Sequence, residues 1–391
     1  MTPARVHAAA RMARIPPYFF AGLRREVERR RAAGVDVVAL DVGDPDLPTP
    51  ETVVESGVAA LRDPRNHGYP PYTGLAELRA AMAAWYARRF DVVLDPETQV
   101  LPLLGSKDGI AHLPLAVVDP GDVVLVPDPG YAVYAAGALM AGGEPHPVAL
   151  RAEDGFLPDL DAIPQGVTRR ARLLWINYPN NPTAAVAPPG FLDAAVAFCA
   201  ERGILCAHDA PYSEVTFGDY RAPSLLQSPG ALDVGVEFHS LSKTYNMTGW
   251  RVGMAVGSAE AIRLLAQVKS NLDSGVFAAV QRAAITALEE PPEALVARNA
   301  VLLDRQTRLC DALAAAGIEV ARPRATFYLW VEVPGRGDSR GFATRLLDAA
   351  AISVTPGVAF GPGGEGFFRV SLTVPTERID EACRRIRALR L

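Results

Sequence analysis

Short apolar runs alternate with helix-length amphipathic stretches along most of the chain. Glycine and proline, 33 of each, gather where the runs meet the helical stretches. Strands that alternate with helices favour a mainly parallel sheet with helices on its faces, so we predict an α/β fold. The strand candidates are residues 123–126, 173–177, 204–208, 236–240 and 252–256, and helices fit residues 75–90, 106–117, 190–202 and 259–271.

The pattern changes at about residue 290. A long helix is followed there by short strands with helices between and after them, which predicts a smaller α+β domain. The long helix fits residues 293–316, and the strands fit residues 326–333, 352–355 and 367–372. We expect three parts: an N-terminal arm with part of the small domain at residues 1–45, a large domain at 46–288, and a small C-terminal domain at 289–391.

The composition excludes several classes of protein. The 391 residues carry 39 basic and 44 acidic side chains, a net charge of −5, and the basic residues gather on no single segment, so we expect no nucleic-acid partner. No uncharged apolar run approaches the ~18 residues that a membrane helix needs, so we expect no membrane role. The expected partner is a small molecule.

Cysteine and histidine are not spaced as metal ligands. The four cysteines form no C-x-x-C or C-x-x-H pattern, which predicts neither a zinc site nor a disulfide framework. The histidines considered stand alone and are expected to be structural or surface residues. We therefore expect no metal and a cytoplasmic location. The residues concerned are Cys199, Cys206, Cys310, Cys383, His112, His146 and His239.

Lysine is rare in this chain. Of the 39 basic residues only Lys107, Lys243 and Lys269 are lysines, which leaves 39 − 3 = 36 arginines. Lysine can lose its proton and form an imine, whereas arginine can do neither, so chemistry that needs a free amine must keep lysine. Lys107 and Lys269 are expected to face solvent or the margin of a phosphate site.

Polar residues follow the apolar run that ends at residue 240. Ser240, Ser242 and Lys243 come at its end, and Arg251 follows eight residues after the lysine. Two hydroxyls and a fixed cation can hold a phosphate, with a primary amine beside them. The alternative is an ordinary strand end with a surface lysine.

Other candidates follow neighbouring strands. Asp209 comes at the end of the run 204–208, where its carboxylate can hold a heteroaromatic nitrogen protonated; the alternative is a helix N-cap. Asn181 follows the run 173–177 in a proline-rich turn, and a plain turn would look similar. Gly105 and Ser106 open a helix whose N-terminus can bind an anion, although many helices begin this way.

The order and spacing of these residues resemble the class I/II aminotransferases, which are pyridoxal 5′-phosphate enzymes of fold type I. Residues 240–253 (SLSKTYNMTGWRVG) match the lysine signature of that family throughout, and the resemblance runs from about residue 14 to the C-terminus. Several segments look closer to its LL-diaminopimelate aminotransferase branch. These segments are residues 43–50, 268–275, 325–330, 355–362 and 364–369. A departure is Ala184, where the family usually has glycine.

The resemblance implies a role for each candidate. Lys243 would bind pyridoxal 5′-phosphate covalently, Asp209 would pair with its ring nitrogen, and Tyr212 with Asn181 would bind its 3′-oxygen. Arg369 would grip the substrate α-carboxylate with help from the backbone at Gly43. The remaining cofactor contacts would be Tyr131 on the ring and, at the phosphate, Ser106, Lys107, Ser240, Ser242, Arg251 and Tyr69, the last from the second subunit of a homodimer.

The function that this resemblance implies is an aminotransferase of EC 2.6.1 type with a ping-pong mechanism. The expected donor is LL-diaminopimelate or a related compound, the expected acceptor is a 2-oxo acid such as 2-oxoglutarate, and the expected pathway is lysine biosynthesis. Alternatives are an N-succinyl-diaminopimelate or broad aspartate/aromatic aminotransferase, or a C–S β-lyase of the same fold. A non-catalytic, cofactor-binding regulator is the alternative from another class.

Overall fold

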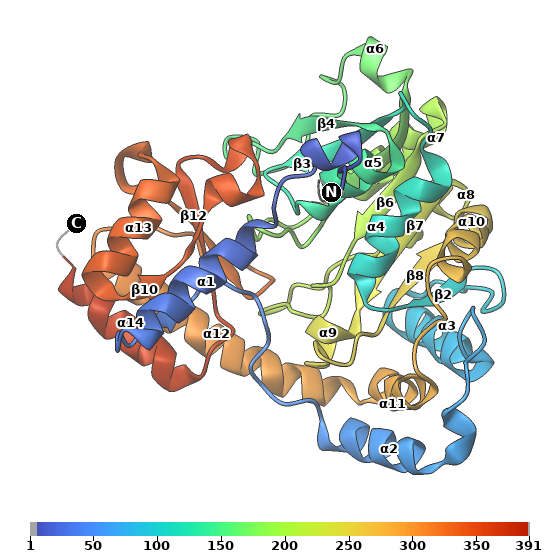
Figure 1. The fold of residues 1–391 in the computed structure, drawn as a ribbon, viewed down its shortest axis with the longest axis horizontal. Coiled ribbons are helices and arrows are strands. Elements are labelled where there is room, and N and C mark those ends of the chain that lie inside the picture. Colours follow the sequence, from blue (N-terminus) through green and yellow to red (C-terminus); the bar gives the residue numbers. More distant parts are fainter. Residues whose placement is uncertain (1–5, 390–391) are drawn as a thin grey trace, which may run out of the picture.

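The computed structural model describes residues 6–389, so the first five residues of the predicted N-terminal arm and the last two of the C-terminal part lie outside it. Its centre is a seven-stranded sheet with the order β2-β8-β7-β6-β5-β3-β4 (Figure 1). All neighbouring pairs from β7 to β4 are parallel, and β8 runs antiparallel to both of its neighbours. The strands are β2 (Val100–Leu103), β3 (Val123–Asp128), β4 (Glu144–Ala149), β5 (Ala171–Ile176), β6 (Leu205–Asp209), β7 (Gly235–Ser240) and β8 (Gly253–Gly257).

Helices cover both faces of this sheet. Successive strand residues belong to different apolar clusters: Val124 and Leu173 pack with one helix layer, and Leu125 and Leu174 with the other. This alternation is expected because neighbouring side chains of a strand point to opposite faces. One layer contains α4 (Ser106–Val117), α5 (Val133–Ala141) and α10 (Ala259–Ser270), and the other contains α3 (Ala76–Phe90) and α7 (Phe191–Arg202). Outside these lie α2 (Glu51–Arg62) and α11 (Ala278–Glu289), and the short helices are α6 (Gln165–Thr168), α8 (Ala231–Val234) and α9 (Leu241–Thr244).

A separate apolar cluster forms a smaller α+β part beside the large sheet (Figure 1). Its strands form a parallel pair, β1 with β10, and an antiparallel sheet with the order β11-β12-β9. These strands are β1 (Val38–Ala39), β9 (Tyr328–Glu332), β10 (Ile352–Ser353), β11 (Thr355–Pro356) and β12 (Phe367–Ser371). The helices are α1 (Phe19–Ala32), α13 (Ser339–Ala350), α14 (Thr376–Ala388) and the long α12 (Pro292–Ala315), which reaches the large part.

The predicted fold class is confirmed, and each predicted strand of the large sheet lies within two residues of its observed position. The prediction missed β2 and β4. Each contains proline, which interrupts a strand pattern, and the strand order places both at the edges of the sheet, where proline is tolerated. Within residues 6–389, every helix is too short or too polar to span a bilayer.

Candidate active site

A cavity of about 1000 Å³ lies where the large and small parts meet. Parallel strands bring their carboxyl ends to one edge of a sheet, so the residues that end β5, β6 and β7 meet there. Residues of α1 and β12 complete the wall. The lining includes the predicted residues Gly43, Ser106, Lys107, Tyr131, Asn181, Asp209, Tyr212, Ser240, Ser242, Lys243, Arg251 and Arg369.

The amine of Lys243 reaches the cavity from the short helix α9. Its Nζ donates to the backbone carbonyl of Gly43 at 3.1 Å. Burial lowers its pKa to about 8, nearby Asp44 opposes this shift, and the cations of Arg251 and Arg369 add to it. A tenth or so of the amine is therefore neutral at pH 7, whereas an ordinary lysine, with a pKa of about 10.4, is neutral in fewer than about one molecule in a thousand.

The carboxylate of Asp209 ends β6 at the floor of the cavity and is 4% exposed. Tyr134 Oη donates to its Oδ2 at 2.7 Å, while its Oδ1 has no hydrogen-bond partner in the described part of the chain. Burial raises the pKa of this acid to about 6, although the bond from Tyr134 lowers it. A buried acid with one unpaired oxygen is suited to a ligand that brings a donor or a positive charge.

Arg369, on β12, lines the same cavity and is 2% exposed. Its Nη1 donates to Asn181 Oδ1 at 2.7 Å and its Nη2 to the carbonyl of Asp41 at 2.7 Å, while its Nε lacks a partner among residues 6–389. The guanidinium lies 4.0 Å from the ring centroid of Tyr328 and 4.7 Å from that of Phe360. An arginine that contacts two aromatic rings and keeps an unused donor can bind a carboxylate.

Two phenols lie close together near the Arg369 guanidinium. Tyr212 Oη is 3.2 Å from Tyr328 Oη, and burial raises the pKa of Tyr212 well above its usual value. The phenol is therefore protonated and can donate to an oxygen of a ligand.

The opposite end of the cavity is positively charged. Arg251 folds over the turn before α4, where its Nη2 donates to the carbonyl of Leu104. Gly105 has a φ of 83°, a left-handed backbone conformation that favours glycine, and a Cβ there would also displace the Arg251 guanidinium. Burial and the neighbouring Arg251 lower the pKa of Lys107. Together with Ser106 at the N-terminus of α4, these groups form a seat for an anion such as a phosphate.

Tyr69 is the one predicted site residue that lies away from the cavity of its own chain. Its side chain is 90% exposed. Other large apolar side chains around it are also exposed: Tyr72 at 57%, Leu272 at 55% and Phe277 at 40%. The loops that carry them touch, because Gly275 packs against the loop that carries Tyr72.

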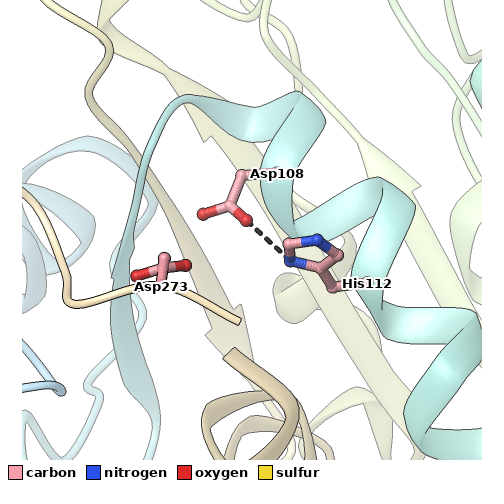
Figure 2. Close-up of side chains that lie close together, drawn as sticks. All are labelled: Asp108, His112 and Asp273. Carbon is pink, nitrogen blue, oxygen red and sulfur yellow. Dashed lines mark ion pairs between the residues drawn. The ribbon is translucent and has the colours of Figure 1, made fainter. Parts of the chain in front are cut away.

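A further polar cluster lies behind the anion seat (Figure 2). Asp108, His112 and Asp273 place potential ligand atoms within 4.8 Å of one another. The ammonium group of Lys269 already forms ion pairs with both carboxylates of this cluster: its Nζ lies 2.9 Å from Asp108 Oδ2 and 2.6 Å from Asp273 Oδ2. Burial raises the pKa of Asp108, but the bonds from His112 and Lys269 outweigh this effect and lower that pKa to about 2. The prediction that Lys269 faces solvent or phosphate is wrong, since it is 1% exposed.

Sequence reasoning missed three residues of the site. Tyr134 holds Asp209, Tyr328 stacks on Arg369, and Tyr18 lies 4.6 Å, ring centroid to Nζ, from Lys107. Tyr134 had a sequence signal, because it lies three residues after Tyr131 at the start of a helix, and the two rings touch edge to face at 5.7 Å. Tyr328 lies in segment 325–330, which carries part of the resemblance, but nothing there marked its contact with Arg369.

One cavity thus holds an amine of lowered pKa, a buried acid, an anion seat and a buried arginine with an unused donor. These groups suit an enzyme that binds a phosphorylated carbonyl cofactor and an amino acid. Residues 35–386 match the family model described as aminotransferase class I and II. The chain belongs to that family: it is an aminotransferase (EC 2.6.1), and the cofactor of the family is pyridoxal 5′-phosphate.

Individual relatives agree with the family. An LL-diaminopimelate aminotransferase of Desulforudis audaxviator is 53% identical over 379 residues, which cover 97% of each chain. The substrate-bound structure of BacF from Bacillus subtilis has a TM-score of 0.96 at 35% identity, covering 99% of both chains. A probable N-succinyldiaminopimelate aminotransferase of Thermus thermophilus has a TM-score of 0.89 at 38% identity, covering 94% of this chain and 99% of that one.

The residues present fit pyridoxal 5′-phosphate. The unpaired Oδ1 of Asp209 can face the ring nitrogen, the turn at Gly105 can seat the phosphate, and the amine of Lys243 lies in the same cavity. The Nε of Arg369, which has no partner within residues 6–389, can bind a carboxylate of the substrate.

Proposed function

We propose that this enzyme transfers the amino group of LL-diaminopimelate to a 2-oxo acid, with 2-oxoglutarate as the expected acceptor, as a step of lysine biosynthesis. The observation that carries the proposal is the 53% identity, over 97% of each chain, to an enzyme named LL-diaminopimelate aminotransferase. Relatives with the same name from other organisms are 48–53% identical. The second candidate is the N-succinyl derivative, which the name of the Thermus thermophilus relative supports.

The proposed cofactor contacts follow the geometry of the cavity. Asp209 would face the ring nitrogen, Tyr212 and Asn181 would bind the phenolic oxygen, and Tyr131 would stack on the ring. The phosphate contacts would be Ser106, Lys107, Ser240, Ser242 and Arg251 from this subunit.

Each half of the cycle needs a base, an acid and a carboxylate clamp. When bound, the cofactor supplies a carbon that takes up the amino group and a ring that withdraws electrons. Lys243 Nζ, which gives up its own proton more readily than an ordinary lysine because of its lowered pKa, would take the proton from the substrate Cα and return it on the cofactor side. Asp209 would keep a proton on the ring nitrogen, because its negative charge favours the cationic form. Arg369 would orient the α-carboxylate through a planar pair of hydrogen bonds.

We also propose that the active enzyme is a homodimer in which Tyr69 reaches the partner's phosphate site. The exposed aromatic and aliphatic side chains around Tyr69 support an apolar contact with a second copy. The test mixes two inactive variants, Tyr69→Ala and Lys243→Ala, after unfolding and refolding together. A hybrid dimer has one site with both residues intact, so about a quarter of the wild-type activity should return. No recovery in a mixture shown to contain hybrids would refute the shared site.

The division of the chain at about residues 45 and 288 and the cytoplasmic location remain part of the proposal. The division is supported by the separate apolar cluster of the small part. The location is supported by the four cysteines, which are buried and free.

The substrate test follows the absorbance of the bound cofactor at the edge of the visible range. Donors are added one at a time without acceptor: LL-diaminopimelate, its N-succinyl form, aspartate, glutamate and an aromatic amino acid. We expect LL-diaminopimelate to bleach the band fastest and 2-oxoglutarate to restore it. Faster bleaching by the N-succinyl form would replace the proposed donor, and pyruvate released from cystathionine without acceptor would indicate a β-lyase.

A further inference from the structure

Arg298, near the start of α12, is a buried cation without a carboxylate partner in the described chain. Its side chain is 8% exposed, and burial lowers its pKa to about 10, although nearby Glu214 opposes this. Its guanidinium bonds go to backbone carbonyls and to the neighbouring amide. The acceptors are the carbonyls of Lys243 (2.9 Å), Thr244 and Glu214 (2.6 Å), and Asn299 Oδ1 (2.7 Å).

Two of these carbonyls belong to the end of α9, the four-residue helix that carries Lys243. So short a helix cannot satisfy its own last carbonyls and is unstable alone. A cation at a helix C-terminus supplies the missing donors and matches the negative end of the helix dipole. Arg298 therefore caps the helix of the reactive lysine.

The third carbonyl belongs to a different segment of the site. Glu214 comes two residues after Tyr212, and Asn299 Nδ2 donates to the same carbonyl at 2.9 Å. One guanidinium thus joins the segment of the proposed base to the segment of the proposed phenol. Arginine suits this task because its rigid fork presents five donors in one plane, whereas lysine has one point of attachment.

The helix that supplies Arg298 continues into the small part. Leu302, Leu309 and Leu313, further along α12, belong to the apolar cluster of that part. The backbone of Lys243 is therefore fastened to an element that is packed in the small part.

We propose that Arg298 is a positioning residue: by capping α9 and binding the Glu214 carbonyl, it holds Lys243 at the depth and orientation at which its amine reacts. This inference rests on the proposed role of Lys243 as the reactive amine.

The test compares Arg298→Lys, which keeps the charge but not the fork, with Arg298→Met, which keeps neither. The first readout needs no cofactor: acetic anhydride labels the protein at a series of pH values, and mass spectrometry measures acetylation of Lys243. The wild-type midpoint is expected near pH 8. In both variants it should rise by about one unit or more, toward the ordinary value for lysine, as the amine leaves its buried position. The second readout is kinetic: kcat should fall about 100-fold, while KM for the donor changes little.

Leu309→Ala is the matched control, because it destabilises the same helix without touching Lys243. A labelling midpoint that stays at the wild-type value in Arg298→Lys, with a fall in kcat no larger than in Leu309→Ala, would overturn the proposal. If Arg298→Met fails to fold, Asn299→Ala, which removes one bond to Glu214 and one acceptor of Arg298, replaces it and should shift the midpoint in the same direction. Failure of the proposed function gives a different result, since Lys243→Ala would then retain transamination.

Discussion

The Asp209→Asn substitution should make the cofactor-free protein more stable at pH 8 while abolishing efficient transamination. Burial raises the pKa of Asp209 to about 6, against an ordinary value of 3.8. Because the folded-state pKa lies above that of the unfolded chain, the unfolded state gives up its proton first as the pH rises. The wild-type protein therefore loses stability between about pH 4 and pH 6. Above pH 6 the whole free-energy penalty of the buried, ionised carboxylate is present. Asparagine keeps an oxygen for Tyr134 and carries no charge.

The size of the effect follows from the shift. Two pKa units correspond to about 3 kcal/mol at pH 8, and the difference falls to about 0.5 kcal/mol at pH 4. An entropy of unfolding of ~2.1 cal/mol/K per residue gives roughly 0.8 kcal/mol/K for a chain of this length, so the Tm of Asp209→Asn should exceed that of the wild type by about 4 °C at pH 8.

The assay is calorimetric unfolding of both cofactor-free proteins from pH 4 to pH 8.5 at one protein concentration. Asp219→Asn, at an exposed acid, is the control and should change Tm little at any pH. Adding pyridoxal 5′-phosphate should reverse the order, since the wild type gains a charge partner that the variant cannot use. A variant that is less stable than the wild type at pH 8, or a difference that does not depend on pH, would refute the assignment of a strained, buried carboxylate at this position.

Neighbouring groups give three further expected outcomes. Tyr134→Phe removes a bond that lowers the pKa of Asp209, so the pH range over which Tm falls should move upward by about one pH unit. A curve of Tm against pH that is unchanged would contradict this. Because the pKa of Lys243 is about 8, cofactor uptake measured by stopped-flow absorbance should accelerate with a midpoint near that pH, not near 10. Lys269→Arg should cost about 2 kcal/mol in urea unfolding, whereas Arg282→Lys at a half-exposed ion pair should cost under about 0.5 kcal/mol, and equal losses would exclude a tightly fitted ammonium site.

Patterns local in the sequence predicted five of the seven strands of the large sheet and several residues that line the cavity. The residues that end β5, β6 and β7 could be assigned to one edge because parallel strands place their carboxyl ends together, and the structure brings Asn181, Asp209 and Lys243 into one cavity. Ala184 can also be understood locally: its φ of 58° is left-handed, which explains why relatives would prefer glycine in this turn. Such features depend on a few consecutive residues.

Contacts between distant segments could not be read in this way. Arg298 lies 55 residues from Lys243, and the two partners of its guanidinium on α9 are carbonyls, which every residue possesses. A backbone acceptor leaves no trace in side-chain chemistry, so no motif marks the arginine that binds it. The same reasoning explains why Arg369 could be nominated only by resemblance, while its stacking on Tyr328 was not foreseen.

The three lysines show where composition does carry structural information. In a chain with 39 basic residues of which three are lysine, two of the three line the cavity and the third lies directly behind its anion seat. Lys269 has no free-amine chemistry to perform, yet it binds Asp108 and Asp273 while 1% exposed. A compact ammonium can contact two converging carboxylates in a space where a planar guanidinium would force them apart. Lysine is therefore retained here for two separate physical reasons, loss of a proton at Lys243 and small size at Lys269, and only the first could be inferred from the sequence.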